Sequence, residues 1–239
     1  MNEHHSPSAV KSIAIVTGAS GNLGQAVTKK FIDEGYFVIG TVIPNDKVPI
    51  DFPADKFEKM VVDLTNEKDS QKFIEAVVEQ YGKIDAAILT VGGFAMGKIA
   101  DTKAADILQQ YKLNFETTYN VARPAFMQMI KQNNGRIFIV GSKPGLDARN
   151  GKGMVAYGLT KSLIFRLADL MNDEAKGKNV VTSVIIPGTI DTPQNRTAMP
   201  DAHFDNWTKP KAIADVIYFY CTDEASVIRE PVIKVYNNA

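Results

Sequence analysis

The stretch from residue 12 to residue 34 constrains the fold of this chain more than any other. An apolar run, Ser12–Thr17, leads into glycines at the spacing G-x-x-G-x-x-G, and an amphipathic stretch, Leu23–Glu34, follows; the glycines are Gly18, Gly21 and Gly24. This order predicts a buried strand, a tight turn and a helix. Glycine allows the turn, the close approach of a phosphate to the backbone, and tight packing of helix on strand.

The same turn predicts a dinucleotide site. A helix that begins near Leu23 directs unpaired N–H groups and the positive end of its dipole at a pyrophosphate. The expected contacts of the turn, besides Gly18, are Ser20, Gly21, Asn22, Leu23 and Gly24. A glycine turn required only by sterics is the alternative, but its place between a strand and an amphipathic helix favours dinucleotide binding.

Apolar runs alternate with helical patterns along the whole chain, which predicts an α/β fold. The expected strands are Ser12–Thr17, Phe37–Ile43, Lys59–Val62, Asp85–Val91, Arg136–Gly141, Val180–Ile186 and Val232–Tyr236. The expected helices are Leu23–Glu34, Glu67–Tyr81, Lys103–Gln132, Val155–Lys176 and Pro210–Thr222. Strands that are apolar on both faces indicate a doubly wound, mostly parallel sheet in a three-layer Rossmann sandwich. Because no linker divides the chain, we expect a single domain over residues 1–239, with residues 1–10 as a flexible tail.

Composition excludes several classes of function. Lys and Arg together number 27 and balance 27 Asp and Glu, so no charge excess points to nucleic acid or an anionic membrane. No apolar run is long enough to span a bilayer, and the start lacks the layout of a secretion signal, so we expect a cytoplasmic protein. Cys221 stands alone, and the histidines offer no metal-ligand spacing: His4, His5 and His203. We therefore expect no structural metal.

Tyr157 and Lys161 stand four residues apart, which places a phenol and an ammonium on one face of the helix predicted over Val155–Lys176. A nearby cation favours the ionised phenol, so we expect the pKa of Tyr157 to fall from about 10 towards neutral pH. Such a tyrosine can give a proton to a carbonyl oxygen as hydride reaches the carbon, or accept it in reverse. Ser142 follows the strand Arg136–Gly141, at a strand end where open α/β sheets bind ligands.

Several motifs now stand in a recognisable order: Thr17-Gly18 with the glycine turn, Asp63-Leu64-Thr65, Asn114, Ser142, Tyr157-x-x-x-Lys161 and Pro187-Gly188. Together they span nearly the whole chain and resemble the short-chain dehydrogenase/reductase family. The resemblance implies a seven-stranded sheet and an NAD(P)-dependent oxidoreductase. Such an enzyme transfers hydride between nicotinamide and a small C=O or C=N substrate. The resemblance also implies a homodimer or homotetramer built through the long helices.

The likeness assigns catalytic roles position by position. Tyr157 resembles the family's acid/base, and Lys161 resembles the residue that lowers the pKa of that tyrosine and holds the nicotinamide ribose. Ser142 resembles the donor to the substrate oxygen. Asn114 resembles the residue that holds a proton-relay water. From its type alone, an asparagine within the helical pattern Lys103–Gln132 predicts a functional or kinked position, with a solvated side chain as the alternative.

Further coenzyme contacts follow from the same likeness. Asp63 would contact the adenine, and Thr192 the nicotinamide carboxamide. The remaining expected coenzyme contacts are Leu64, Gly92, Pro187 and Gly188. Judged by residue type alone, Asp63 fits a cap of the following helix equally well.

One departure from the usual family pattern and one closer likeness within the family bear on the substrate. The second glycine of the family's turn stands where this chain has Asn22. A longer match, from Asp191-Thr192-Pro193 to Trp207, is similar to the dihydropteridine reductases, which reduce quinonoid dihydropterins with NADH and lack the catalytic serine. Because Ser142 is present here, a carbonyl substrate fits at least as well, and both substrates stay open.

Two further alternatives concern which coenzyme binds, NAD or NADP, and whether the chain is an enzyme or a sensor. The strand Phe37–Ile43 is followed neither by an acid for the ribose 2′-hydroxyl nor by an arginine for a 2′-phosphate. Asp46 could bend back to the ribose, or Lys47 could meet a 2′-phosphate, so NAD and NADP both stay open. A catalytically silent NAD(P) redox sensor of the same fold is the alternative function, although the intact Tyr157–Lys161 pair favours an enzyme.

The loops at the expected ligand-binding edge of the sheet are also candidates for contact with a ligand. The long segment Thr189–Pro210 reads as an irregular lid or binding loop. Three apolar residues in or beside the ligand loops are either walls of a substrate pocket or ordinary packing: Phe94, Met96 and Trp207.

Overall fold

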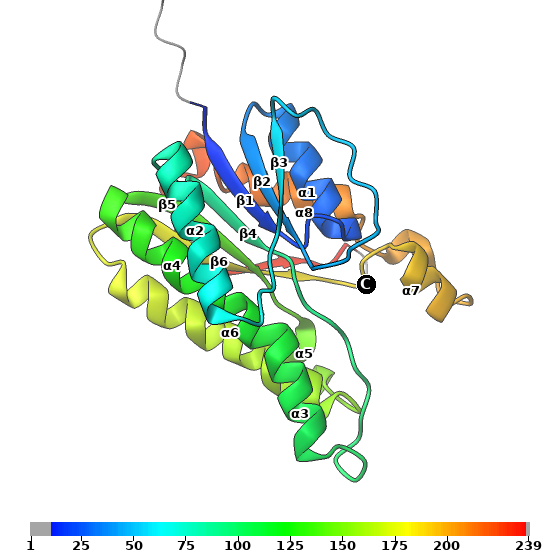
Figure 1. Cartoon of the computed structure of the whole chain (residues 1–239). Coiled ribbons are helices and arrows are strands. Elements are labelled where there is room, and N and C mark those ends of the chain that lie inside the picture. The colour runs from blue at the N-terminus through cyan, green and yellow to red at the C-terminus, as the bar shows by residue number, and fades with distance from the viewer. Residues whose placement is uncertain (1–10, 238–239) are drawn as a thin grey trace, which may run out of the picture.

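The computed structural model describes residues 11–237, and their strands form one seven-stranded sheet in the order β3-β2-β1-β4-β5-β6-β7 (Figure 1). Every pair of neighbouring strands is parallel. The strands are β1 Ile13–Thr17, β2 Phe37–Val42, β3 Phe57–Val61, β4 Ala86–Leu89, β5 Asn134–Val140, β6 Asn179–Pro187 and β7 Val232–Val235. The doubly wound α/β prediction is confirmed. The predicted flexible tail, residues 1–10, lies outside the described residues.

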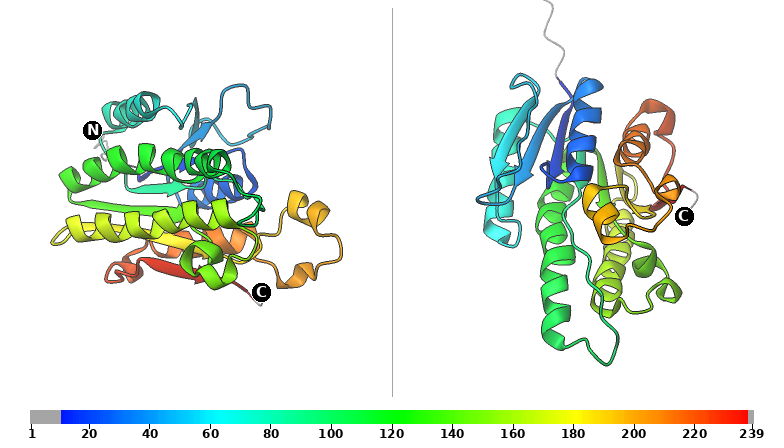
Figure 2. Two further views of the ribbon diagram at one scale, coloured as in Figure 1. Left: turned by 90° about the horizontal axis from the view of Figure 1, so that it is seen from below. Right: turned by 90° about the vertical axis from the view of Figure 1, so that its right-hand side faces the viewer.

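Helices cover both faces of the sheet (Figures 1 and 2). They are α1 Asn22–Asp33, α2 Glu67–Tyr81, α3 Ala104–Tyr111, α4 Thr117–Gln132, α5 Lys143–Leu146, α6 Val155–Glu174, α7 Pro193–Ala198 and α8 Pro210–Phe219. Helices α1 and α8 pack in one apolar cluster, and α2, α4 and α6 pack in a second cluster with the opposite sides of the same strands.

Strand β1 shows why helices pack on both faces of the sheet. Its alternate residues Ala14 and Val16 join the cluster of α1 and α8, whereas Ile13 and Ile15 join the cluster of α2, α4 and α6. All five residues of β1 are buried. A strand buried on both faces is apolar throughout, which is the pattern that the sequence carries.

Two predicted segments need correction. The helix expected over Lys103–Gln132 contains a π-helical turn at Lys112–Glu116, which separates α3 from α4. The segment Thr189–Pro210 is not wholly irregular, because α7 lies within it. Thr192 caps that helix by accepting a hydrogen bond from the Asn195 N–H at 3.1 Å, and Pro193 occupies the first helical position, where a missing N–H costs nothing.

The parallel sheet brings the segments that carry the predicted site residues to one edge. β1, β4, β5 and β6 all end there, at Thr17, Leu89, Val140 and Pro187. The segments that leave these strands are the glycine turn, the loop after β4, α5 with Ser142, and the lid segment, which we define as residues 189–210. Open α/β sheets bind ligands at this edge.

The described part of the chain contains neither a membrane-spanning helix nor a cluster of metal ligands. No helix within residues 11–237 is both long and apolar enough to cross a membrane. Within the same residues, no group of three or more His, Cys, Asp or Glu side chains is arranged to hold a metal ion.

Candidate active site

The glycine turn after β1 has the geometry that a phosphate cradle needs. Gly18 has a φ of +65°, in the left-handed region that favours glycine. The Gly21 N–H donates to the Gly18 carbonyl at 3.0 Å, and a Cβ on Gly24 would lie only 2.0 Å from that same carbonyl oxygen. Among the described residues, no side chain caps the start of α1. Its first N–H groups can therefore bind an anion, so the turn fits the pyrophosphate of a dinucleotide.

An acidic residue from the loop after β2 reaches this turn. The Ser20 hydroxyl donates to the Asp46 carboxylate, which also accepts a hydrogen bond from the Val48 N–H at 2.9 Å. The hydrogen bond from Ser20 is the largest of the causes that lower the pKa of Asp46 below its usual value. Lys47 is exposed. Asp46 therefore brings a negative charge to the glycine turn, four residues beyond the end of β2 at Val42.

The three predicted catalytic side chains from β5 and α6 come together. Ser142 caps α5: its Oγ accepts a hydrogen bond from the Gly145 N–H at 3.1 Å, and its side chain lies close enough to the Tyr157 phenol to lower the pKa of that phenol. Tyr157 lies in the first turn of α6. Lys161 lies one turn further along, and its Nζ donates to the Val140 carbonyl at 2.8 Å. Only 6% of Ser142 and 4% of Lys161 is exposed, so this polar cluster is largely shielded from water.

The ionisation of this cluster differs from the sequence prediction. Burial raises the pKa of the Tyr157 phenol, and the neighbouring Ser142 side chain offsets only part of the rise. The predicted fall in this pKa is therefore wrong for the protein without coenzyme. The physical reason is that the Lys161 ammonium binds the Val140 carbonyl, while the phenol loses contact with water. Burial also lowers the pKa of Lys161 from 10.5 to about 8.

Asn114 lies at the centre of the π-helical turn and is fully buried, so the alternative of a solvated side chain is wrong. Its Oδ1 accepts from the Gly93 N–H at 2.9 Å, and its Nδ2 donates to the Gly93 carbonyl at 3.0 Å and to Gln110 Oε1 at 2.9 Å. A Cβ on Gly92 would lie 2.8 Å from Asn114 Oδ1 and 3.0 Å from Lys161 Nζ. Asn114 thus fixes the loop after β4 against Lys161. Single π-helical turns are frequent at functional sites.

The loop after β4 also supplies an aromatic neighbour for the phenol. The Phe94 ring meets the Tyr157 ring edge-to-face, with centroids 5.1 Å apart. The Gly97 N–H donates to the Gly153 carbonyl at 2.7 Å, which ties this loop to the segment before α6. Phe94 and Met96 are 60% and 67% exposed, so this loop offers apolar surface, and Phe94 places part of that surface beside the phenol.

Comparison with known proteins decides the family. The family model described as "short chain dehydrogenase" matches residues 12–203, a range that contains the glycine turn, Asn114, Ser142, Tyr157 and Lys161. This chain is a short-chain dehydrogenase.

Relatives among characterised proteins are oxidoreductases. The 3-oxoacyl-(acyl-carrier-protein) reductase FabG of Thermotoga maritima is 27% identical to this dehydrogenase over 237 residues, covering 93% of this chain and 95% of the relative. The acetoacetyl-CoA reductase of an Acinetobacter species is 25% identical over 190 residues, covering 77% of this chain and 76% of the relative.

Solved structures share the fold of the dehydrogenase. A short-chain dehydrogenase/reductase from Mycobacterium ulcerans superposes with a TM-score of 0.85 at 22% identity, covering 95% of this chain and 89% of that one. ElxO with NADP bound gives the same TM-score and identity, covering 94% of this chain and 97% of that chain.

The remaining predicted coenzyme residues lie at the same edge of the dehydrogenase. Asp63 is exposed and accepts from the Thr65 N–H at 3.0 Å and the Thr65 hydroxyl at 2.7 Å. It does not cap α2, because Asn66 does so, which removes the capping alternative. The buried Leu64 gives its carbonyl to Asn120 Nδ2 at 2.9 Å. At the end of β6, Pro187 and Gly188 lead into the lid segment.

Sequence reasoning missed some members of the site and left others undecided. Gln110, which orients Asn114, stands one helical turn before it, and that i,i+4 spacing was the available signal. The Val140 carbonyl that binds Lys161 carries no signal in the sequence. Trp207 is buried against Phe204, with ring centroids 4.8 Å apart, so it packs the lid segment rather than facing solvent.

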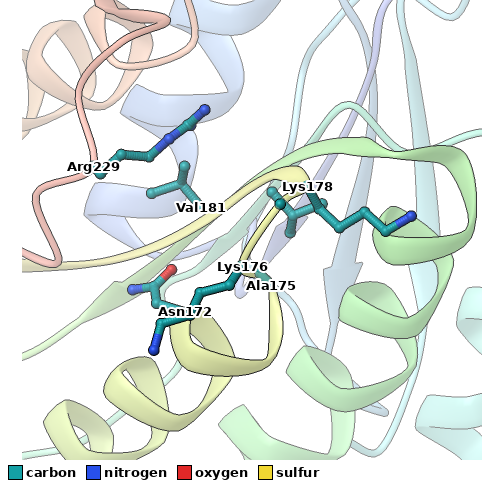
Figure 3. A pocket seen from close by; sticks show the side chains of 8 residues that line it. Asn172, Ala175, Lys176, Lys178, Val181 and Arg229 are labelled. Carbon is teal, nitrogen blue, oxygen red and sulfur yellow. The ribbon is translucent and has the colours of Figure 1, made fainter.

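One cavity borders the predicted coenzyme site, and another lies far from it. One, of about 410 Å³, includes Pro44 and Asp63 in its lining, at the predicted adenine end. The other, of about 280 Å³, lies at the opposite edge of the sheet, near the start of β6. Figure 3 shows that its basic side chains extend in different directions: Lys176, Lys178 and Arg229. They do not converge on a common point in that cavity.

Proposed function

We propose that this dehydrogenase reduces a small carbonyl compound with a nicotinamide coenzyme, and that Tyr157 donates the proton. The observation that carries the proposal is the placement of the Ser142 side chain beside the Tyr157 phenol, one helical turn from the buried Lys161. These three side chains lie at the same sheet edge as the glycine turn. A proton donor and a proposed coenzyme cradle therefore lie at one edge of the sheet.

The side chains divide the work of a reduction. When bound, the coenzyme supplies hydride from C4 of its nicotinamide. Tyr157 gives its phenolic proton to the carbonyl oxygen while the carbonyl carbon receives the hydride, so that C=O becomes CH–OH. The raised pKa of Tyr157 keeps the phenol protonated at neutral pH, as a proton donor requires. Ser142 orients the substrate oxygen, and Lys161, held by Val140, places a positive charge beside the ribose.

Other residues hold the coenzyme in this proposal. The backbone of the glycine turn, residues 18–24, binds the pyrophosphate. Asp63 and Leu64 lie at the adenine end, and Gly92 leaves room beside Lys161. Asn114 fixes the loop that carries Gly92, and the role of this asparagine in holding a relay water stays a prediction.

We further propose that NADH is preferred over NADPH. A phosphate monoester carries about two negative charges near neutral pH, and the carboxylate of Asp46 at the glycine turn repels such a group. The hydroxyls of an unphosphorylated ribose can instead donate hydrogen bonds to this carboxylate. The Ser20–Asp46 hydrogen bond supports this choice, because it holds the acid at the turn.

The substrate is proposed to present an apolar body beside its carbonyl group. Phe94 offers exposed apolar surface next to Tyr157, and the same loop carries the exposed Met96. The relatives named above are reductases of 3-oxoacyl and acetoacetyl thioesters, which supports a carbonyl over a pterin. Replacing Ser142 by alanine separates the two, because reduction of a carbonyl should lose most of its rate, whereas reduction of a quinonoid pterin should barely change.

Assembly and location enter as proposals as well. The long helices α4 and α6 carry exposed apolar side chains, namely Tyr119, Met127, Leu159, Leu163 and Leu170. We propose that a homodimer or homotetramer buries them and that the protein acts in the cytoplasm. Light scattering at micromolar concentration tests the assembly, and a monomer would contradict it.

The decisive experiment measures NADH and NADPH oxidation with a panel of oxoacyl thioesters, short ketones, quinones and pterins. Tyr157→Phe should lower turnover by about 10²- to 10⁴-fold while the coenzyme dissociation constant stays nearly unchanged. Tyr220→Phe, at the end of α8 and outside both the site and the proposed subunit interface, is the matched control and should behave as wild type. A wild-type protein that binds coenzyme and reduces no member of the panel would instead support the redox sensor.

A further inference from the structure

One side-chain contact joins the two segments that border the proposed coenzyme cleft. Asn22 Nδ2, in the first turn of α1, donates to Gln194 Oε1 in α7 at 2.9 Å, although the residues are 172 positions apart in sequence. Figure 2 shows α7 beside the start of α1 in its right-hand view. The Asn22 backbone belongs to the phosphate cradle, and Gln194 lies two residues after Thr192, the expected carboxamide contact. The contact therefore closes one border of the cleft.

The base of the lid segment is fixed to the sheet. Ile190 and Thr208 form a parallel bridge, and the Asp191 N–H donates to the Thr208 carbonyl at 2.9 Å. Thr208 is buried, and its hydroxyl donates to the Val235 carbonyl at 3.0 Å. These contacts fix both ends of the lid segment, and the residues between them lie outside the sheet.

The lid segment is also braced internally. Asp191 and Arg196 form a two-point ion pair, with N···O distances of 2.6 and 2.9 Å. The Arg196 guanidinium lies 4.7 Å from the centroid of the Phe204 ring, which in turn packs on Trp207. These contacts hold α7 and the turn at Phe204–Asn206 as one body, so that a single contact at Gln194 can restrain the whole lid segment.

We propose that Asn22 and Gln194 form a latch that holds the lid segment closed and slows the release of the coenzyme. This inference rests on the proposed function, because it needs a coenzyme between the two segments. Asn22 is suited to the task because its backbone lies in the phosphate cradle while its side chain is free of any role in the turn geometry. Both residues of the latch are positioning residues, since neither is placed at the reacting atoms.

A double-mutant cycle on coenzyme release tests the latch. Asn22→Ala, Gln194→Ala and the double variant are compared with wild type by stopped-flow fluorescence of bound NADH. The net value of one neutral hydrogen bond predicts that each single variant releases NADH about two- to tenfold faster. The double variant should release it no faster than either single variant, because all three lack the same bond.

Two controls keep the outcome unambiguous. Thr197→Ala lies on α7, where its hydroxyl bonds the Pro193 carbonyl, and it should leave release unchanged. Gln194→Met keeps the length of the side chain without its acceptor and should match Gln194→Ala. Unchanged release in both single variants, or effects that multiply in the double variant, would overturn the latch. If wild-type protein binds neither NADH nor NADPH, the proposed function itself fails.

Discussion

The buried ammonium of Lys161 makes the stability of this dehydrogenase depend on pH in a predictable direction. Its pKa is about 8 in the folded chain, against 10.5 in an ordinary environment. Between these values the unfolded chain binds more protons than the folded chain, so stability rises with pH. Because one pKa unit corresponds to about 1.4 kcal/mol, the charged side chain costs the fold about 3 kcal/mol below pH 8, and this cost disappears as pH rises towards 10.5.

The perturbation that isolates this effect is Lys161→Met. The variant leaves the Val140 carbonyl without its donor, but that loss does not depend on pH. We expect the free energy of unfolding of wild type, relative to the variant, to rise by about 2.5 kcal/mol between pH 7 and pH 10. Other titrating groups contribute equally to both proteins and cancel in the comparison.

Urea unfolding of both proteins at pH 7 and pH 10 measures this quantity. Stability curves that stay parallel over the whole pH range would refute the burial of a charged Lys161. The same titration has a functional consequence, because the ammonium is proposed to assist the coenzyme and the phenol. We therefore expect kcat/KM for reduction to fall as the pH rises through about 8.

Three further predictions follow from individual contacts. Gly24→Ala places a Cβ 2.0 Å from the Gly18 carbonyl, so calorimetry should show coenzyme affinity lowered by more than about tenfold, whereas unchanged affinity would argue against the cradle. Asp46→Asn removes the charge from the glycine turn, so the ratio of kcat/KM for NADH over NADPH should fall by about tenfold or more; a constant ratio would assign the discrimination elsewhere. Asn114→Ala leaves the Gly93 N–H and carbonyl unpaired and should lower the unfolding free energy by about 1–3 kcal/mol in urea, together with turnover; wild-type values for both would contradict the positioning role.

The element order was predictable because each signal is local. The glycines at 18, 21 and 24 and the apolar run of β1 specify a strand, turn and helix without reference to the rest of the chain. Short elements were harder to predict. Helix α5, Lys143–Leu146, depends on a Ser142 cap within a four-residue stretch, and so short a stretch has no periodic pattern to recognise.

Part of the site could also be predicted from the sequence. The spacing of Tyr157 and Lys161 fixes them on one helix face, since α-helical geometry alone determines that relation. Asparagine is a poor helix former, so Asn114 within a helical pattern predicted an unusual position. The structure shows a buried residue in a π-helical turn. The predicted direction of the pKa of Tyr157 was wrong, because proximity in sequence says nothing about burial or about the carbonyl that binds Lys161.

The sequence by itself determined the order of strands and helices, the glycine turn and the helix face that carries the phenol and the ammonium. The tertiary structure alone decided how these parts act on one another. It brought Asp46 to Ser20, Gly92 between Asn114 and Lys161, and Gln194 to Asn22. The physical reason is that the periodicity of a strand or helix depends on a few neighbouring residues. Desolvation and contacts between distant loops depend instead on which strand ends meet at one edge of the sheet.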